Sequence, residues 1–203
     1  MELSTTTTKK GRINVHADGE YLFTVSAFIW YRSPLCGKTE AAPEALEELR
    51  LQGLESDAYE KGLRLLGSRA HAEKELRTKL TRAYPADAAD AAVARLKEAG
   101  LIDDASYAAA LAEELQRRKN YSPQRIAMEL THRGVDAETA KNAANGLDID
   151  KKEGIINILN KMHLPERPAK KDVDRLLRRL LNAGYTMREI REVISFSEDR
   201  WED

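Results

Sequence analysis

The segment Ser122-Pro-Gln-Arg-Ile126-Ala-Met-Glu-Leu130-Thr-His-Arg-Gly134 decides the fold of this 203-residue chain. A serine followed by a proline is typical of a helix start, because the serine hydroxyl caps free backbone amides and proline fits the first helical position. Ile126 and Leu130 lie one turn apart and give the helix one apolar face. Gly134 is typical of a helix end. The segment therefore predicts a short amphipathic helix that buries one face against its neighbours.

The same pattern occurs 50 residues earlier and 50 residues later in the chain. Three sets of apolar positions share this offset, and Gly134 matches Gly184, whereas the first copy has Tyr84 at that place. The three sets are Leu76, Ile126 and Leu176; Leu80, Leu130 and Leu180; and Val93, Ala143 and Val193. A period near 50 residues predicts a repeat array, in which each unit buries its open face on its neighbours.

Helix-start signals place the boundaries of these units. Asp57-Ala-Tyr-Glu60, Asp150-Lys-Lys-Glu153 and Thr186-Met-Arg-Glu189 resemble capping boxes. Asp103-Asp104 and Asp136 are each expected to open a further helix. The first of these helices is expected to bury a stripe of Tyr59, Leu63 and Leu66. We therefore predict an all-α fold of tandem three-helix repeats at residues 56–102, 103–149 and 150–203.

The first 55 residues lack the helical repeat pattern and are predicted to form an N-terminal extension. Residues 1–10 are polar and rich in threonine, and we expect them to be disordered. Residues 12–25 alternate in strand period around Asp18-Gly19, which predicts a β-hairpin with a type I′ turn. Its apolar face should pack on residues 27–31 or on the first helical unit. Residues 43–51 are expected to form a short helix that ends at Gly53.

Composition limits the class of protein. Basic and acidic residues nearly balance, at 33 and 34, so overall charge does not indicate a nucleic-acid partner. No apolar run approaches the ~20 residues of a membrane helix, and the N-terminus lacks the apolar core of a secretion signal. Cys36 is the only cysteine, which excludes an internal disulfide and fits a reducing, cytoplasmic location.

Catalytic and metal-binding motifs are missing from the sequence. The four histidines are scattered, and neither His-x-x-x-His nor Cys-x-x-Cys spacing occurs, so a zinc site is not expected. There is no glycine-rich phosphate loop, and we interpret Cys36 as a plain loop thiol. The pair Asp103-Asp104 stands at a helix start, where capping is the expected role. The sequence indicates a binding protein, with no enzymatic activity, metal or cofactor expected.

Basic residues on the predicted helices are the candidate binding contacts, because such groups bind phosphates or an acidic protein surface. The alternative is pairing with nearby acids one helical turn away, as Glu75 and Lys79 could do. Tyr84, Tyr121 and Tyr185 fall near helix ends, where we expect them to pack across corners rather than to stack on bases. The candidates are Lys74, Arg77, Lys79 and Arg82 in the first repeat, Arg125 and Arg133 in the second, and Lys170, Lys171, Arg175, Arg178 and Arg179 in the third.

These polar positions do not repeat with the apolar ones. The third repeat has Lys171, Arg175, Arg178 and Arg179 along one helical stripe, whereas the first has His71, Glu75, Thr78 and Lys79 at the same places. A shared core with different surfaces predicts one scaffold whose modules contact different parts of a single target.

Three stretches together resemble the RecX family of recombination regulators. They are Leu65-Leu-Gly-Ser-Arg-Ala-His-Ala-Glu-Lys-Glu-Leu-Arg-Thr-Lys-Leu80, Leu96-Lys-Glu-Ala-Gly-Leu-Ile-Asp-Asp-Ala-Ser-Tyr-Ala108 and Ser122-Pro-Gln-Arg-Ile-Ala-Met-Glu-Leu-Thr-His-Arg-Gly-Val135. The Asp-Gly-Glu-Tyr hairpin resembles the N-terminal extension of longer members. The chain departs from the family pattern at Ala72, where serine or threonine is usual, so one helix should lack a side-chain cap.

The resemblance implies an elongated, curved array of three-helix repeats that binds the RecA recombinase filament on DNA and lies in its helical groove. It further implies inhibition of the recombinase, ATPase and coprotease activities, no cofactor, and in some members direct binding of single- or double-stranded DNA. Two rival hypotheses remain: a general DNA-binding helical protein without a recombinase partner, and a scaffold with no link to nucleic acid. Nothing in the sequence demands a dimer, so we expect a monomer.

Overall fold

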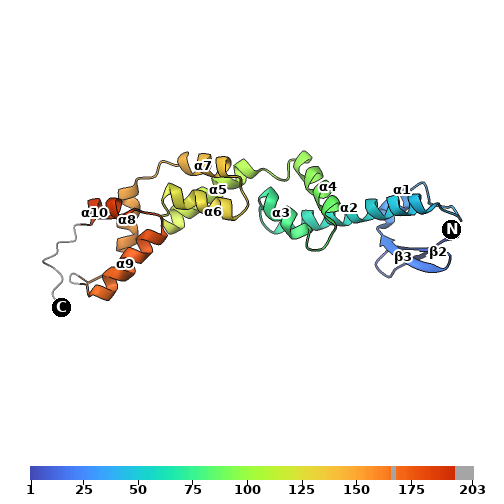
Figure 1. Ribbon diagram of the computed structural model, residues 1–203, viewed down its shortest axis with the longest axis horizontal. Helices are drawn as coiled ribbons and strands as arrows, with labels where there is room; N and C mark the ends of the chain where they lie inside the picture. Colours follow the sequence, from blue (N-terminus) through green and yellow to red (C-terminus); the bar gives the residue numbers. More distant parts are fainter. Residues whose placement is uncertain (166–167, 195–203) are drawn as a thin grey trace. The chain divides into compact units, whose positions relative to one another are not determined.

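The structure, a computed structural model, describes residues 1–165 and 168–194 (Figure 1). The chain forms two compact units, Met1–Asp103 and Asp104–Asp203, and each is described by itself. The described residues are mostly helical, with a small sheet at the N-terminus, which confirms the predicted fold class. Part of the predicted third repeat, residues 166–167 and 195–203, lies outside the described residues.

The first unit begins with a three-stranded antiparallel sheet in the order β1-β2-β3. Strands β2 (Ile13–Ala17) and β3 (Glu20–Val25) form the predicted hairpin, and the positive φ angles of Asp18 and Gly19 at its turn confirm that interpretation. The prediction of disorder for residues 1–10 is wrong, because Leu3–Thr7 forms β1 along β2. Its β-branched threonines suit an extended backbone, and Leu3 is buried in the core.

Two helices cover this sheet. Helix α1 (Ala27–Arg32) is capped by Ser26 and contributes Trp30 to the core. Helix α2 (Pro43–Ser68) is a single 26-residue helix, so the predicted end at Gly53 and the predicted start at Asp57 are both wrong. Gly53 instead permits close packing, because a Cβ atom there would lie 2.5 Å from Cγ1 of Val25. The predicted boundary at residues 55/56 falls inside this helix, and the repeat boundaries stay predictions.

The C-terminal half of α2 packs with α3 (Glu73–Leu80) and α4 (Ala86–Glu98) as the first three-helix group. The predicted stripe on α2 is partly wrong, because Leu63 is exposed and the buried positions are Ala58 and Gly62. Small residues allow the neighbouring helices to approach α2 closely. Ala72 occupies the N-cap position of α3 and forms no side-chain cap, as predicted. Its methyl group is fully buried.

The second unit contains two more three-helix groups. The first consists of α5 (Asp104–Lys119), α6 (Pro123–His132) and α7 (Ala137–Asn145), and the second of α8 (Lys151–Asn160), α9 (Lys170–Asn182) and α10 (Met187–Val193). Four predicted helix starts are confirmed, because Ser122, Asp136, Asp150 and Thr186 each accept backbone N–H bonds there. Local capping therefore sets where these helices begin.

The 50-residue register holds for the second helix of each group. Leu76, Ile126 and Leu176, like Leu80, Leu130 and Leu180, are at most 2% exposed. In the third helix of each group the 50-residue register shifts by one residue between the first and second groups. Helices α4, α7 and α10 begin at residues 86, 137 and 187. Ala144, rather than the half-buried Ala143, is buried as Val93 is. For the same reason the counterpart of Tyr84 and Tyr185 is Val135.

Candidate binding interface

Helix α9 carries the most uniform set of predicted contact residues. Leu176 and Leu180 face the core, and five cations are exposed on the rest of the helix. No described carboxylate lies within 4.0 Å of any of them. Nε of Arg178 donates a hydrogen bond to the backbone oxygen of Asp174, at 3.2 Å. Within the described residues, no ion pair neutralises these five charges. We call this set the α9 basic face: Lys170, Lys171, Arg175, Arg178 and Arg179.

The candidates on α3 and in the turn that follows it divide into two pairs. Arg77 contacts Glu73 at 3.5 Å and Asp90 of α4 at 3.0 Å, and Lys79 lies 3.7 Å from Glu75. These ion pairs fulfil the alternative interpretation, in which basic residues are neutralised within the molecule. Lys74 and Arg82 are exposed and, within the described part of the chain, have no ion pair.

The two candidates on α6 share one carboxylate. Arg125 and Arg133 lie 3.6 and 3.8 Å from Glu129, which stands between them on the helix. The guanidinium of Arg125 also lies 5.4 Å from the centroid of the Tyr121 ring. Its Nε atom is buried and has no hydrogen-bond partner among the described residues. The side chain of Arg125 is therefore fixed by contacts with Glu129 and Tyr121, and its charge is partly neutralised.

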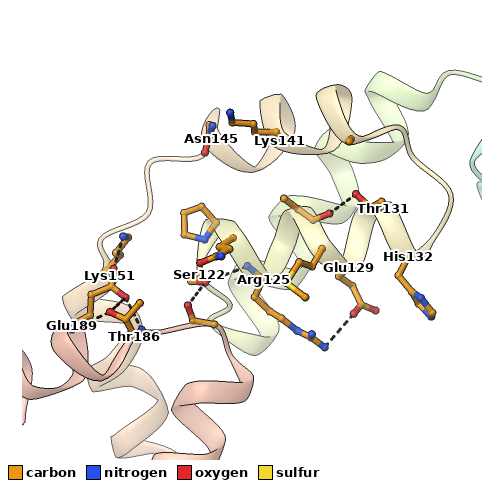
Figure 2. Close-up of a pocket in the computed structure, with 16 residues that line it drawn as sticks. Ser122, Arg125, Glu129, Thr131, His132, Lys141, Asn145, Lys151, Thr186 and Glu189 are labelled. Atoms are coloured by element: carbon orange, nitrogen blue, oxygen red, sulfur yellow. Dashed lines mark hydrogen bonds and ion pairs between the residues drawn. The ribbon is translucent and has the colours of Figure 1, made fainter.

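A groove adjoins α6, and sequence reasoning did not predict it. Its volume is about 1240 Å³, and its lining comes from α6, α7 and the first turns of α8 and α10. Figure 2 shows Lys141 on the α7 margin and the ion pair between Lys151 and Glu189 at the other end. Met128 is 57% exposed on the α6 side. An apolar surface bordered by charges of both signs has the character of a surface that can hold a peptide segment.

The described residues do not form a metal site, a disulfide or a membrane-spanning helix. No group of three His, Cys, Asp or Glu side chains within them could hold a metal ion. Cys36 is exposed and free. No helix in residues 1–165 and 168–194 is long and apolar enough to cross a membrane.

Family comparisons identify the three-helix groups. Residues 58–96 match the sequence model described as RecX, first three-helix domain, and residues 103–143 match RecX, second three-helix domain. These ranges coincide with the helices that carry the Leu76–Leu80 and Ile126–Leu130 core positions.

Curated relatives and a solved structure agree. The chain is 33% identical over 137 residues to regulatory protein RecX of Mycobacterium ulcerans, covering 65% of this chain and 79% of that protein. It is 32% identical over 128 residues to the Levilactobacillus brevis protein of the same name, covering 63% of this chain but only about half, 48%, of that relative. A crystal structure of regulatory protein RecX matches with a TM-score of 0.67 at 20% identity, over 95% of this chain and 98% of the other, which shows the shared fold. With the repeat pattern and these matches together, the chain belongs to the RecX family of regulatory proteins.

Proposed function

We propose that this protein binds the RecA filament on DNA and modulates it, mainly by inhibiting its recombinase, ATPase and coprotease activities. The role belongs to DNA repair, recombination and the SOS response, in the cytoplasm. The family supports a regulatory protein with a protein partner. The observation that carries the proposal is the α9 basic face, whose five cations form no ion pair with a described residue.

The physical case for a filament partner is charge distribution. Unpaired Lys and Arg side chains gain energy from phosphates and acidic surfaces, whereas cations already paired gain little. The α9 basic face is therefore the proposed main contact, with Lys74 and Arg82 as further contacts. Arg77, Lys79, Arg125 and Arg133 would contribute only if a partner displaced their carboxylates. Many modest contacts of this kind suit a target made of protein and DNA.

A binding comparison tests the proposal. The full chain is titrated onto RecA-coated and onto naked single-stranded DNA at several salt concentrations. We expect clearly tighter binding to the coated strand, together with a lowered rate of RecA ATP hydrolysis. Equal affinity for both would contradict the filament proposal, and a steep salt dependence on naked DNA would favour a general DNA-binding protein instead. Sedimentation of the free chain tests the proposed monomer.

A further inference from the structure

The short helix α1 lies near the N-terminal end of the chain (Figure 1). Two of its aromatic side chains are exposed. Trp30 is 6% exposed and belongs to the core beneath the sheet, whereas Phe28 and Tyr31 are 66% and 67% exposed. Among the described residues these are the two most exposed large apolar side chains. The segment therefore packs on the sheet, as predicted, through only one of its faces.

An arginine completes this surface. The guanidinium of Arg32 lies 5.2 Å from the centroid of the Phe28 ring, and no described carboxylate is within 4.0 Å of it. Its positive charge is therefore not neutralised within the described part of the molecule. We call Phe28, Tyr31 and Arg32 the α1 aromatic surface.

The positions of Phe28 and Tyr31 on α1 suit the contact of two consecutive nucleotides. Positions three apart on a helix lie on the same face, separated by about 4.5 Å along the axis. Stacked bases repeat about every 3.4 Å along a strand, and an extended single strand can reach the larger spacing. Aromatic rings bind bases by stacking and tolerate any sequence, because every base has a π face. An arginine beside the rings supplies the charge that the intervening phosphate needs.

We propose that the α1 aromatic surface is a binding site for single-stranded DNA, in which two bases stack on Phe28 and Tyr31 while Arg32 contacts the phosphate. The choice of DNA as the nucleic acid rests on the proposed function. The site itself does not need the recombinase. Duplex DNA is disfavoured, because its bases are already stacked and present no free faces. A protein partner is a competing occupant that the experiment separates.

The first measurement is the affinity of the full chain for a labelled oligothymidine of about 12 nucleotides, within the range of known single-strand sites. Replacing both rings in the variant Phe28→Ala/Tyr31→Ala should weaken binding by about 30-fold or more, the effect of losing two stacked bases. The matched control Leu51→Ala/Leu63→Ala removes exposed apolar side chains from α2 and should bind as the unmodified chain does. Tyr31→Phe keeps a ring and should retain most of the affinity.

The charge is tested separately. Arg32→Gln should reduce the slope of log affinity against log salt by about 0.7, the value for one phosphate contact on a single strand. The thermal melting curves of all variants should stay close to that of the unmodified chain, because the replaced side chains are mostly exposed.

A cross-linking measurement on the unmodified chain avoids indirect effects of the substitutions on folding. An oligonucleotide carrying 5-iodouracil is cross-linked by light to the unmodified chain, and the attached peptide is identified by mass spectrometry. Cross-links at Phe28 or Tyr31 support the site. Cross-links confined to α9, or an affinity of the double-alanine variant within twofold of the control, would overturn it. A change of oligomeric state in that variant with unchanged DNA affinity would also overturn it, in favour of a protein-binding surface. None of these outcomes depends on RecA.

Discussion

The hydroxyl group of Tyr185 donates a buried hydrogen bond of 2.8 Å to the backbone oxygen of Asn120. This contact joins the α9–α10 corner to the α5–α6 corner. Ser122 adds two more bonds at the same place, from its N–H to the oxygen of Ala183 and from its hydroxyl to the oxygen of Gly184, both 2.9 Å. The last two helical groups are therefore fastened through their corners, as expected for an array in which neighbours share an interface.

Gly184 is a sensitive point of this junction. Its φ of +90° is unfavourable for other residues, and a Cβ atom there would clash with the hydroxyl of Ser122 and Cβ of Arg125. We expect Gly184→Ala to lower the free energy of unfolding of the second unit by about 2–4 kcal/mol, the sum of backbone strain and overpacking. Gly100→Ala is the control, with φ of +69° but no atom within 4 Å of the added Cβ. It should cost only about 1–2 kcal/mol. Equal losses in urea unfolding would mean that the corner contact is loose.

Tyr185 also makes stability depend on pH. Burial, followed by the negative charges of Glu189 and Asp150, raises the pKa of Tyr185 to about 12, from an ordinary value of 10. Below pH 10 the phenol is protonated in both folded and unfolded chains, so its contribution is complete. Between pH 10 and pH 12 the unfolded chain releases the proton first, and stability falls as pH rises.

The expected loss over this interval is roughly 2–3 kcal/mol. Other groups titrate in the same range, so the measurement is the difference between the unmodified chain and Tyr185→Phe in urea unfolding at pH 8 and at pH 11. The variant should be less stable at pH 8, because the Asn120 oxygen loses its donor. The gap should narrow at pH 11. A gap that stays constant would show that the phenol titrates normally.

Local signals in the sequence predicted much of the helical part. Caps such as Ser122 and Thr186, and leucines one turn apart, act over a few residues and can be recognised without the fold. Features that depend on distant partners were missed. Strand β1 forms because Leu3–Thr7 pairs with β2, although its threonines alone resemble a disordered segment. Gly53 resembles a helix end but is placed by contact with Val25.

The candidate interface shows the same division. The amphipathic pattern of α9 was sufficient to predict its basic face. Neutralisation of Arg77 could not be foreseen in full, because Asp90 comes from another helix. The groove beside α6 depends on how α7, α8 and α10 pack, and the periodicity of the sequence does not predict that packing. Sequence reasoning thus found the cations, and the structure separated the paired from the unpaired ones.

The core register gives a direct stability test. Leu130 is fully buried, whereas Leu181 is 45% exposed. We expect Leu130→Ala to destabilise the second unit by about 2–5 kcal/mol, since it removes a buried side chain and leaves a cavity. Leu181→Ala should cost under about 1 kcal/mol. A loss at Leu130 as small as that at Leu181, measured by urea unfolding, would contradict the repeat register.

An ion pair holds the N-terminal sheet on α2. The guanidinium of Arg12, the residue before β2, binds both carboxylate oxygens of Asp57, at 2.8 and 2.6 Å. The hydrogen bond to Asp57 is the main cause that raises the pKa of Arg12, and burial opposes this rise. In a double-mutant cycle with alanine, we expect a coupling energy of about 1 kcal/mol. The more exposed pair Arg50–Glu47 within α2 is the control and should give under about 0.5 kcal/mol. Similar couplings would show that Arg12 does not anchor the sheet.

The α9 basic face leads to the functional prediction. Replacing Lys171, Arg175, Arg178 and Arg179 by glutamate turns an unpaired positive surface into a negative one. We expect binding to RecA-coated DNA to weaken at least tenfold and inhibition of ATP hydrolysis to decrease in parallel. Folding should be retained, because all four side chains are exposed and make no described ion pair.

The control for that variant keeps the charge and changes the shape: Arg175→Lys, Arg178→Lys and Arg179→Lys together. If the face acts mainly through its positive potential, this variant should bind within a few-fold of the unmodified chain. A loss as large as that of the glutamate variant would instead indicate bidentate arginine contacts. Unchanged inhibition by the glutamate variant would exclude α9 as a main contact. The contact would then have to lie elsewhere, and the remaining unpaired candidates from the sequence are Lys74 on α3 and Arg82 in the turn after it.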